Sequence, residues 1–385
     1  MKKVYLDNAA TSFPKPPGVA EAMVHFMNNI GANPGRGAYD AALESGRILL
    51  EARQLLADLF GVDDSAQIIF TSNITASLNI ALKGLLREGC HVITSSMEHN
   101  SVMRVLHALE RTRKIEVSCV ACSTAGVLDP QDIRRAIRSN TTAIVLTHAS
   151  NVTGTIMPVA EVGRIAHEAG LFYVIDTAQT AGICPLDVKT MHADVLAFTG
   201  HKGLMGPQGT GGFYVRKEVV SLMNSLFEGG TGSMSADEEQ PDFLPDKYES
   251  GTPNTVGIAG LGAGLRFIRH QGLQSIKLWE DNLTKKLLDG LLSLDKLTVY
   301  GLQDYTKQTG TISIGFSEHD EAEISFLLAQ KYGIMARTGL HCSPAAHKTI
   351  GTFPQGTLRF SIGYFNTEEE IEYTVESLAK VMHAI

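Results

Sequence analysis

The chain has 385 residues, 44% of them hydrophobic and 19% charged, and a formal net charge of -8 at pH 7. That length exceeds one ordinary hydrophobic core, so we expect two domains or lobes. The acidic balance, without a block rich in Lys and Arg, argues against nucleic-acid binding, and no apolar run approaches the roughly 20 residues of a membrane span. Asp7 and Asn8 interrupt the apolar stretch that a signal peptide needs, so the expected location is the cytoplasm.

The first half of the chain alternates between apolar, strand-like runs and amphipathic helical stretches. Strands are predicted over 66–72, 90–96, 115–120, 141–148, 171–179, 193–202 and 209–216, and helices over 76–86, 100–112, 130–138 and 159–170. Strands that are apolar throughout and separated by helices indicate a mostly parallel sheet buried on both faces. In such α/β sheets, ligands bind beyond the carboxyl ends of the strands.

The pattern changes after about residue 265. The segment 228–254 is rich in Gly, Pro and acids and too long for a plain connector, so we expect it to be mobile or functional. A long helical stretch over roughly 258–294 then leads to short strands and further helices, which predict a smaller α+β lobe. These elements are expected as strands over 297–301, 311–316 and 357–363, and as helices over 321–333 and 367–385.

The five cysteines are an odd number, thinly spread, which does not suggest a disulfide framework; they are Cys90, Cys119, Cys122, Cys184 and Cys342. Cys119 and Cys122 form a C-x-x-C in a strand-like run without the second pair of a zinc site, and we favour a structural role over a redox or metal role. Cys342 lies in "RTGLHCSP", a stretch without helical or strand periodicity. By itself it could be a buried thiol, a metal ligand, a disulfide partner or a nucleophile.

Polar side chains follow three of the predicted strands. The clusters are His148, Ser150 and Asn151, then Asp176 and Gln179, and then Thr199, His201 and Lys202. Asp176 and Lys202 are separated by one strand–helix–strand step. This arrangement suits pyridoxal 5'-phosphate (PLP), whose carbonyl forms a Schiff base with a lysine and whose protonated pyridine nitrogen pairs with a carboxylate. We predict no metal site.

Ten ordered motifs make the sequence resemble the class V aminotransferase group of fold-type I PLP enzymes, and within it the cysteine desulfurases. They are "YLDNAATS", "NPGRGAY", "FTSNITASLNIA", "MEHNS", "SNVTGT", "DTAQ", "TGHKGLMGPQGTG", "ESGTPN", "RTGLHC" and "LRFSIGYFNT". The resemblance implies an α/β fold of type I, with a large domain of mostly parallel sheet flanked by helices. The implied divisions are an N-terminal segment 1–15 that packs with the small domain, a PLP-binding domain 16–260, and a small α+β domain 261–385 with the cysteine loop.

The resemblance assigns cofactor roles residue by residue. Lys202 corresponds to the lysine of the Schiff base, Asp176 to the partner of the pyridine nitrogen and Gln179 to a ligand of the ring hydroxyl. His99 corresponds to the histidine that stacks on the ring, and a catalytic role in moving protons is expected of it as well. The phosphate positions and the remaining cofactor contact correspond to Thr75, Thr199, His201 and Asn151. Thr252 matches a residue that reaches the phosphate of a neighbouring subunit, which implies a homodimer. Ile74 departs from the family, which commonly has a second hydroxyl residue there.

The resemblance also assigns the substrate contacts. Arg359 matches the arginine that binds the substrate α-carboxylate, and Asn151 falls near the substrate. Cys342 matches the thiolate that takes sulfur from the substrate and becomes a persulfide, and the loop is similar to that of group II (Suf-type) enzymes. Arg337 and His341 could hold this thiolate by charge or hydrogen bonding, and Arg337 is also expected among the substrate-binding residues. Leu340 and Ser343 depart from the usual loop residues.

The predicted function is therefore a PLP-dependent cysteine desulfurase that converts L-cysteine to L-alanine. The alternatives are a selenocysteine lyase acting on L-selenocysteine, another class V lyase or epimerase, and a PLP-binding protein without catalysis. A nucleophilic Cys342 is favoured over an inert thiol. The expected partners are the small-molecule substrate, a second copy of the chain and a sulfur-acceptor protein, without nucleic acid or membrane.

Overall fold

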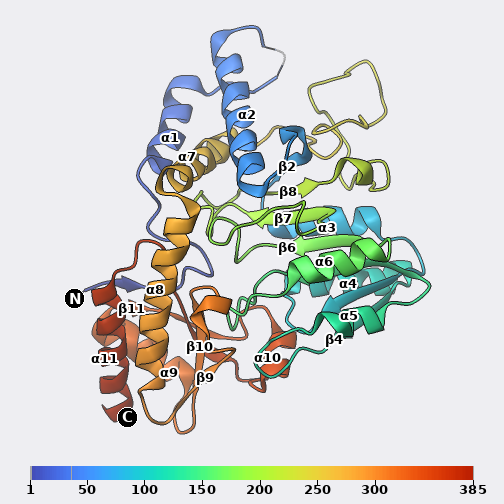
Figure 1. Ribbon diagram of the computed structural model, residues 1–385. Helices are drawn as coiled ribbons and strands as arrows, with labels where there is room; N and C mark the ends of the chain where they lie inside the picture. Colours follow the sequence, from blue (N-terminus) through green and yellow to red (C-terminus); the bar gives the residue numbers. More distant parts are fainter. Residues whose placement is uncertain (1, 36, 385) are drawn as a thin grey trace.

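The computed structural model describes residues 2–35 and 37–384. Its larger lobe is built on a seven-stranded sheet in the order β2-β8-β7-β6-β5-β3-β4 (Figure 1). Neighbouring strands run parallel except around β8, which is antiparallel to β2 and β7. The strands are β2 (Ile68–Thr71), β3 (His91–Ser95), β4 (Glu116–Val120), β5 (Thr141–Thr147), β6 (Phe172–Asp176), β7 (Val195–Thr199) and β8 (Gly211–Val215). The prediction of a mostly parallel sheet is confirmed.

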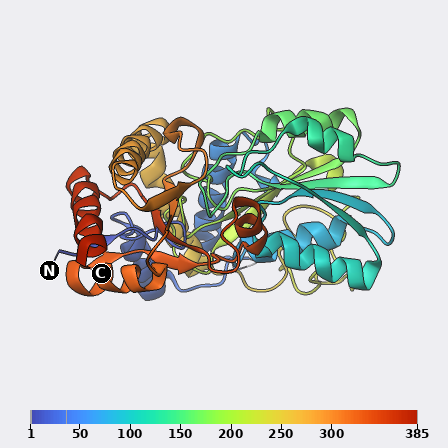
Figure 2. The same ribbon diagram turned by 90° about the horizontal axis from the view of Figure 1, so that it is seen from below.

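Helices cover both faces of this sheet because its strands are apolar on both sides. One face packs on α3 (Ile74–Leu85) and α4 (Asn100–Arg113). The other face packs on α2 (Asp40–Phe60), α5 (Pro130–Ala136), α6 (Val159–Glu168) and α7 (Thr255–Gln271). Figure 2 shows α5 and α6 on one side of the sheet and α3 and α4 on the other.

The smaller lobe has a four-stranded antiparallel sheet in the order β12-β13-β10-β9. Its strands are β9 (Leu297–Tyr300), β10 (Thr311–Phe316), β12 (Arg337–Gly339) and β13 (Thr357–Ser361), and its helices are α8 (Leu273–Leu292), α9 (Glu321–Leu327), α10 (Pro344–Ile350) and α11 (Glu368–Ala384). Leu287 of α8, Leu378 of α11 and Phe360 of β13 belong to a separate hydrophobic core. The predicted α+β lobe is therefore confirmed.

The N-terminal segment connects the two lobes. β1 (Val4–Tyr5) pairs in parallel with β11 (Ile334–Met335) of the smaller lobe. A few residues later, the Ser12 N–H donates to the His201 carbonyl of the larger lobe at 3.0 Å. The chain then enters α1 (Val19–His25), which packs on α7.

The long helical stretch predicted over 258–294 is two helices. Gly272 has φ +81, where a helix cannot continue, and α7 ends and α8 begins on either side of it. The expected domain boundary between 260 and 261 falls inside α7, whose Leu261 and Leu265 belong to the core of the larger lobe. We propose that the division between the lobes lies within α8 instead, because Ile276 still belongs to the core of the larger lobe, whereas Leu283 belongs to that of the smaller lobe.

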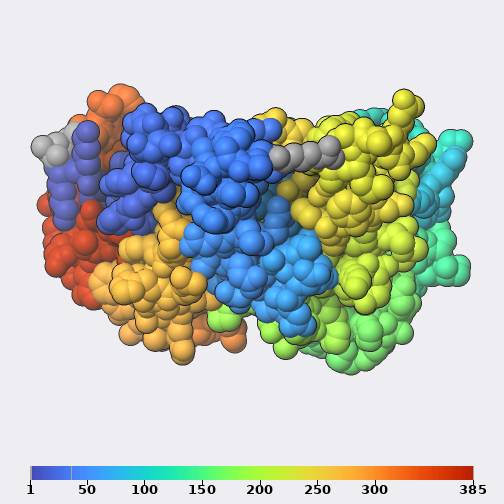
Figure 3. Space-filling view, turned by 90° about the horizontal axis from the view of Figure 1, so that it is seen from above, coloured from blue at the N-terminus to red at the C-terminus, as the bar shows by residue number. Residues whose placement is uncertain are grey.

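The segment 228–254 contains no helix or strand. Figure 3 shows it, in yellow, on the same face of the molecule as the blue N-terminal helices. None of the helices that the structure describes has the length and hydropathy to cross a membrane.

Gly163 of α6 marks a close approach between this helix and the turn that precedes β7. A Cβ at Gly163 would lie 1.9 Å from the Met191 carbonyl oxygen, whereas a Cβ at Gly46 of α2 would meet nothing within 4 Å. Gly163→Ala should therefore lower the free energy of unfolding by about 1–3 kcal/mol through overpacking. Gly46→Ala should raise it by about 0.5–1 kcal/mol. Urea denaturation of both variants checks this, and equal effects of the same sign would contradict it.

Candidate active site

The strand ends that carry Asp176 and Lys202 are neighbours in the sheet. Asp176 is the last residue of β6, and Lys202 follows shortly after Thr199, the last residue of β7. β6 and β7 are paired and parallel, with Asp176 opposite Ala197. Their carboxyl ends meet at one edge, and the Asp176 carboxylate acts electrostatically on the Lys202 amine.

The Lys202 amine lies in an environment that favours its neutral form. Burial is the largest influence and lowers the pKa of Lys202 to about 8, while Asp176 acts in the opposite direction. A neutral amine is the nucleophilic form of lysine, so this environment prepares Lys202 to attack a carbonyl near neutral pH.

Asp176 and His99 are joined by Ser101. The Asp176 carboxylate is buried; it accepts from the Ala178 N–H at 2.9 Å and from the Ser101 hydroxyl at 3.5 Å. Burial raises the pKa of Asp176, and Lys202 is among the groups that lower it. A cation held against this carboxylate would stabilise its charged form.

His99 is held as a neutral imidazole. It is the N-cap of α4, and its Nδ1 accepts from the Ser101 N–H at 3.0 Å. Because Nδ1 is an acceptor, the proton of the neutral ring is on Nε2. Burial, followed by the charge of Lys202, lowers the pKa of His99 to about 4. The ring can therefore stack on a flat cofactor without adding a charge.

Glu98 holds the start of the loop that carries His99 through hydrogen bonds to Ser95 and Thr147. One carboxyl oxygen accepts from the Ser95 hydroxyl at 2.6 Å, and the Thr147 N–H lies 3.1 and 3.0 Å from the two oxygens. Burial raises the pKa of Glu98 to about 8. These bonds fix the end of β3 against β5, and with it the start of the loop that carries His99.

Two buried polar atoms near Lys202 have no hydrogen-bond partner among the described residues. They are Thr199 Oγ1 and His201 Nδ1. Leaving such groups unpaired costs free energy, so they indicate a ligand with hydrogen-bonding oxygens. Thr75 lies exposed in the first turn of α3, whose N-terminal N–H groups favour an anion. The chemistry of this set fits a phosphate group, and with Asp176 and Lys202 it fits PLP.

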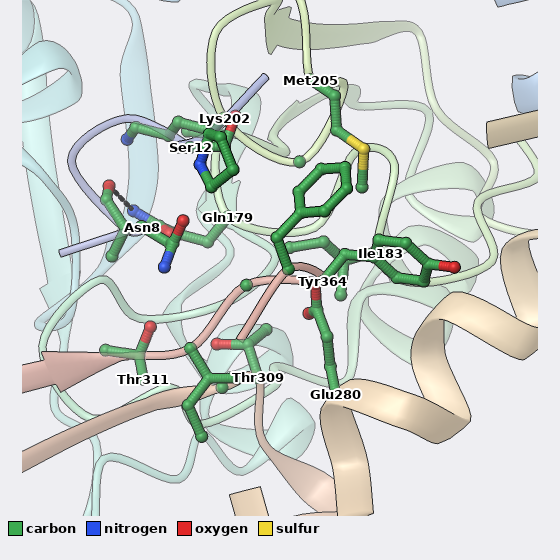
Figure 4. A pocket seen from close by; sticks show the side chains of 18 residues that line it. Asn8, Ser12, Gln179, Ile183, Lys202, Met205, Glu280, Thr309, Thr311 and Tyr364 are labelled. Carbon is green, nitrogen blue, oxygen red and sulfur yellow. Dashed lines mark hydrogen bonds between the residues drawn. The ribbon is translucent and has the colours of Figure 1, made fainter. Parts of the chain in front are cut away.

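A small cavity beside Lys202 lies where three parts of the chain meet (Figure 4). Its volume is about 30 Å³, and it is lined by Lys202 and Gln179 of the larger lobe, Ser12 of the N-terminal segment and Thr309 of the smaller lobe. Gln179 Nε2 donates to the Ala9 carbonyl at 3.2 Å. The structure therefore places Gln179 in the same cavity as the lysine.

Two arginines converge on Asp7 of the N-terminal segment. Arg359 is buried in β13; its Nη2 donates to Asp7 Oδ1 at 3.0 Å, and its Nη1 donates to the Asn151 carbonyl at 2.9 Å. Arg337 donates to Asp7 Oδ2 from Nη2 at 2.8 Å and from Nε at 3.0 Å. Its guanidinium fork, expected to hold the Cys342 thiolate, is occupied by Asp7. Arg359 Nε–H is buried and has no hydrogen-bond partner among the described residues, so it can donate to a bound anion.

Cys342 is exposed on a loop that is tied to the site. Its carbonyl accepts from the Asn100 N–H at 2.8 Å, next to His99. Cys342 and His341 have φ +59 and +46, in the left-handed region that non-glycine residues seldom adopt. Such strain persists only where surrounding contacts hold it, and it is frequent at functional sites.

His341 does not supply the positive charge that we considered for it. Burial, followed by the charges of Arg359 and His347, lowers the pKa of His341 to about 2. The imidazole is therefore neutral, with Nε2 3.3 Å from Thr357 Oγ1. The cationic groups that act on this ring include Arg359 and Arg337, whose guanidinium groups are both bound to Asp7.

Thr252 and the two cysteines of the C-x-x-C pair are the remaining predicted residues. Thr252 is exposed and lines a cavity of about 340 Å³ with Ser72 and Ala76 of the same chain. Burial raises the pKa of both Cys119 and Cys122 to about 11. In the described part of the chain, all five cysteines are free and no group of ligating side chains could hold a metal ion.

Four contacts of the site were missed from the sequence. Asp7, Ser12, Glu98 and Ser101 all lie within motifs of the resemblance, "YLDNAATS" and "MEHNS", which were the available signal. Their partners are remote in sequence or hidden in loop geometry, so spacing alone could not assign them.

The pKa of Lys202 makes the stability of the cofactor-free protein depend on pH. The pKa of Lys202 is about 8 in the folded protein and 10.5, its ordinary value, in the unfolded chain. Below pH 8 the amine is charged in both states, so the folded protein bears the full free-energy cost of burying that charge. Between these values the unfolded chain binds more protons, and stability rises with pH. Lys202→Met should therefore stabilise the cofactor-free protein at about pH 7, and its advantage should shrink at about pH 9.5.

Urea denaturation at both pH values measures this effect. Lys285→Met, at an exposed position of α8, is the control and should show no such pH-dependent gain. If Lys202→Met raised the free energy of unfolding by the same amount at both pH values, the lowered pKa of Lys202 would be contradicted.

Comparison with known proteins agrees with this geometry. The class-V aminotransferase family matches residues 4–374. A probable cysteine desulfurase of Methanothermobacter thermautotrophicus is 36% identical over 383 residues, covering 98% of this chain and 94% of that protein. A probable cysteine desulfurase of Pyrococcus abyssi is 31% identical over 392 residues, covering 99% and 95%.

Solved structures share the fold from end to end. An apo cysteine desulfurase from Thermococcus onnurineus NA1 superposes with a TM-score of 0.93 at 32% identity, covering 100% of this chain and 95% of that one. The cysteine desulfurase CsdA of Escherichia coli, with an S-sulfonic acid, gives 0.90 at 27% identity, with coverages of 100% and 95%. The chain belongs to the class-V aminotransferase family, which is PLP-dependent and has the fold-type I architecture.

Proposed function

We propose that this protein is a cysteine desulfurase that converts L-cysteine to L-alanine and carries the sulfur as a persulfide on Cys342. The observation that carries the proposal is the position of Cys342: it is an exposed thiol on a loop, and its carbonyl accepts a hydrogen bond from the Asn100 N–H, next to His99. The names of the relatives support the same activity.

Sulfur transfer to Cys342 balances without a further reagent. The Cys342 thiolate attacks the sulfur of the substrate, so that an S–S bond forms as the carbon–sulfur bond of the substrate breaks. The electron pair of the broken bond stays on carbon, which takes a proton and becomes the methyl group of alanine. The carbon gains two electrons, and the Cys342 sulfur and the substrate sulfur together lose them as they reach the persulfide level.

The residues of the strand-end cluster would hold the cofactor. PLP, when bound, supplies an electron sink for bonds around the substrate Cα and Cβ. The residues that would bind it are Lys202, Asp176, Gln179, His99, Thr199, His201, Thr75 and Asn151. His99 can exchange a proton at Nε2, because its Nδ1 is occupied by the Ser101 N–H.

Arg359 would bind the substrate α-carboxylate. The side chain is 3% exposed, and its Nε–H has no partner among the described residues, so a carboxylate here would satisfy a buried donor. Asp7 balances part of the charge of Arg359 and Arg337, which leaves one net positive charge for one carboxylate.

The proposal extends to the partners of the protein and to its cellular location. The exposure of Cys342 suits delivery of its sulfur to an acceptor protein. We infer a homodimer in which Thr252 reaches the cofactor phosphate of the neighbouring subunit, and we infer the cytoplasm as the location.

Removal of the nucleophile tests the function. Cys342→Ala should lower alanine formation from L-cysteine by about 100-fold or more, because the sulfur has no acceptor on the enzyme. Mass spectrometry of the wild type after L-cysteine should find an added sulfur on the peptide that contains Cys342. L-Selenocysteine is the second substrate: retained turnover of it by Cys342→Ala would favour selenocysteine lyase activity.

Cys119→Ala is the matched control. Cys119 is also an exposed cysteine, yet burial of its thiol raises its pKa to about 11, so its loss should not alter turnover. Full activity of Cys342→Ala on L-cysteine would overturn the proposed role of Cys342.

A heterodimer of two variant chains tests whether each cofactor site is built from residues of both subunits. Lys202→Ala and Thr252→Ala chains should each bind PLP poorly, for different reasons. In a heterodimer of the two, one site combines an intact Lys202 with an intact Thr252 from the neighbour, so PLP binding should return at about half of the sites. Absorbance of the Lys202-bound cofactor measures this. If mixing restores nothing, Thr252 acts within its own chain or not at all.

A further inference from the structure

The hydroxyl of Ser343 makes a contact that the helix it precedes does not explain. Ser343 is the N-cap residue of α10, where a serine commonly accepts a hydrogen bond from the first turn of its own helix. Within the described chain it makes no such bond. The hydroxyl is fully buried and instead donates to Asn151 Oδ1 at 2.7 Å.

The orientation of the Asn151 amide is fixed by its second bond. Asn151 Nδ2 donates to the His341 carbonyl at 2.7 Å. A carbonyl can only accept, so the nitrogen must face His341 and the oxygen must face Ser343. The amide therefore binds the residues on both sides of Cys342, one through the backbone and one through the side chain.

Asn151 also connects this loop to the substrate-binding arginine. Its own carbonyl accepts from Arg359 Nη1 at 2.9 Å. Ser343, Asn151 and Arg359 thus form one hydrogen-bonded chain from the cysteine loop to a buried cation. Of the two N–H groups of the Asn151 side-chain amide, one binds the His341 carbonyl and the other can donate to a ligand.

The loop needs such a tether because its backbone is strained. His341 and Cys342 are consecutive residues with positive φ, and each such residue costs of the order of 1 kcal/mol or more unless contacts compensate. The Asn151 amide and the Asn100 N–H, which donates to the Cys342 carbonyl at 2.8 Å, supply those contacts.

We propose that Ser343 is a positioning residue for the Cys342 thiol, acting through the Asn151 amide. The proposal rests on the proposed function, in which Cys342 accepts sulfur from a substrate bound at Arg359. Ser343 keeps the loop in the conformation from which the thiol reaches that substrate. Without the hydroxyl the loop moves, the thiol is less often in place, and the substrate carboxylate still finds Arg359.

Ser343→Ala removes this hydroxyl alone. The backbone at Ser343 has φ −134 and ψ 63, outside the left-handed region, so alanine meets no positive-φ penalty there and the variant should fold. In the PLP-loaded enzyme, kcat for L-cysteine should fall on the order of 10-fold while KM stays within about twofold, because positioning is lost and carboxylate binding is kept. Alkylation of Cys342 by iodoacetamide, followed by peptide mass spectrometry, should become several-fold faster as the loop loosens.

Thr374→Val is the matched control. Thr374 of α11 is also fully buried and donates its hydroxyl to a carbonyl, that of Glu370 at 2.8 Å, but it lies outside the site. It should change neither kcat nor the alkylation rate, even if it lowers the melting temperature as much as Ser343→Ala does.

Two outcomes overturn the proposal. In one, Ser343→Ala keeps the wild-type kcat, whether or not alkylation becomes faster; in the other, kcat falls but the alkylation rate of Cys342 stays unchanged. Failure of the proposed function is distinguished by the wild type: if it forms no alanine from L-cysteine, that function is wrong, while the alkylation rates still report whether Ser343 holds the loop.

Discussion

A lysine amine that must be buried and still remain reactive is the constraint around which this molecule is arranged. Burial lowers the pKa of Lys202 to about 8, and Asp176 limits that fall. A carboxylate can stay at this depth only with partners, which the Ala178 N–H and Ser101 supply. The doubly covered parallel sheet provides the dry location, since the ends of β6 and β7 lie under helices on both faces.

The two lobes are joined at this site by charge as well as by packing. Asp7 lies on the segment that follows β1, and its carboxylate binds Arg359 and Arg337 from two strands of the smaller lobe. The same segment continues to the carbonyl of His201, which accepts from the Ser12 N–H at 3.0 Å and from Lys15 Nζ at 2.9 Å. An N-terminal segment of about a dozen residues therefore links the arginine of the smaller lobe to the residue beside Lys202.

Periodicity was sufficient for most of the fold and for part of the site. Apolar runs predicted the parallel strands, and because parallel strands end at one edge, the neighbourhood of Asp176 and Lys202 followed from topology. Contacts such as Arg337 with Asp7 join residues 330 positions apart, which no local pattern encodes. The break at Gly272 was missed because helical periodicity continues across it, and only the positive φ separates α7 from α8.

The neutral state of His341 was also beyond the sequence. A histidine beside a cysteine suggests a cation that stabilises a thiolate, but burial and the charges of Arg359, His347 and Arg337 lower the pKa of this ring to about 2. Charge near a residue depends on all the elements packed around it, and here those elements come from β12, β13 and α10. The positive charge next to this ring is that of Arg359 and Arg337, which both bind Asp7.

Exposure and electrostatics together separate Cys342 from the other cysteines. Cys119 is exposed too, but burial of its sulfur and the charge of Glu98 raise its pKa to about 11, which disfavours the thiolate. Cys342 has a strained backbone, with φ +59, and its carbonyl accepts a hydrogen bond from the Asn100 N–H of a neighbouring segment. A thiol that must meet a bound substrate and later an external acceptor needs a loop that is both exposed and restrained. The hydroxyl of Ser343 donates to Asn151 and makes no hydrogen bond to its own helix, and this contact restrains the loop.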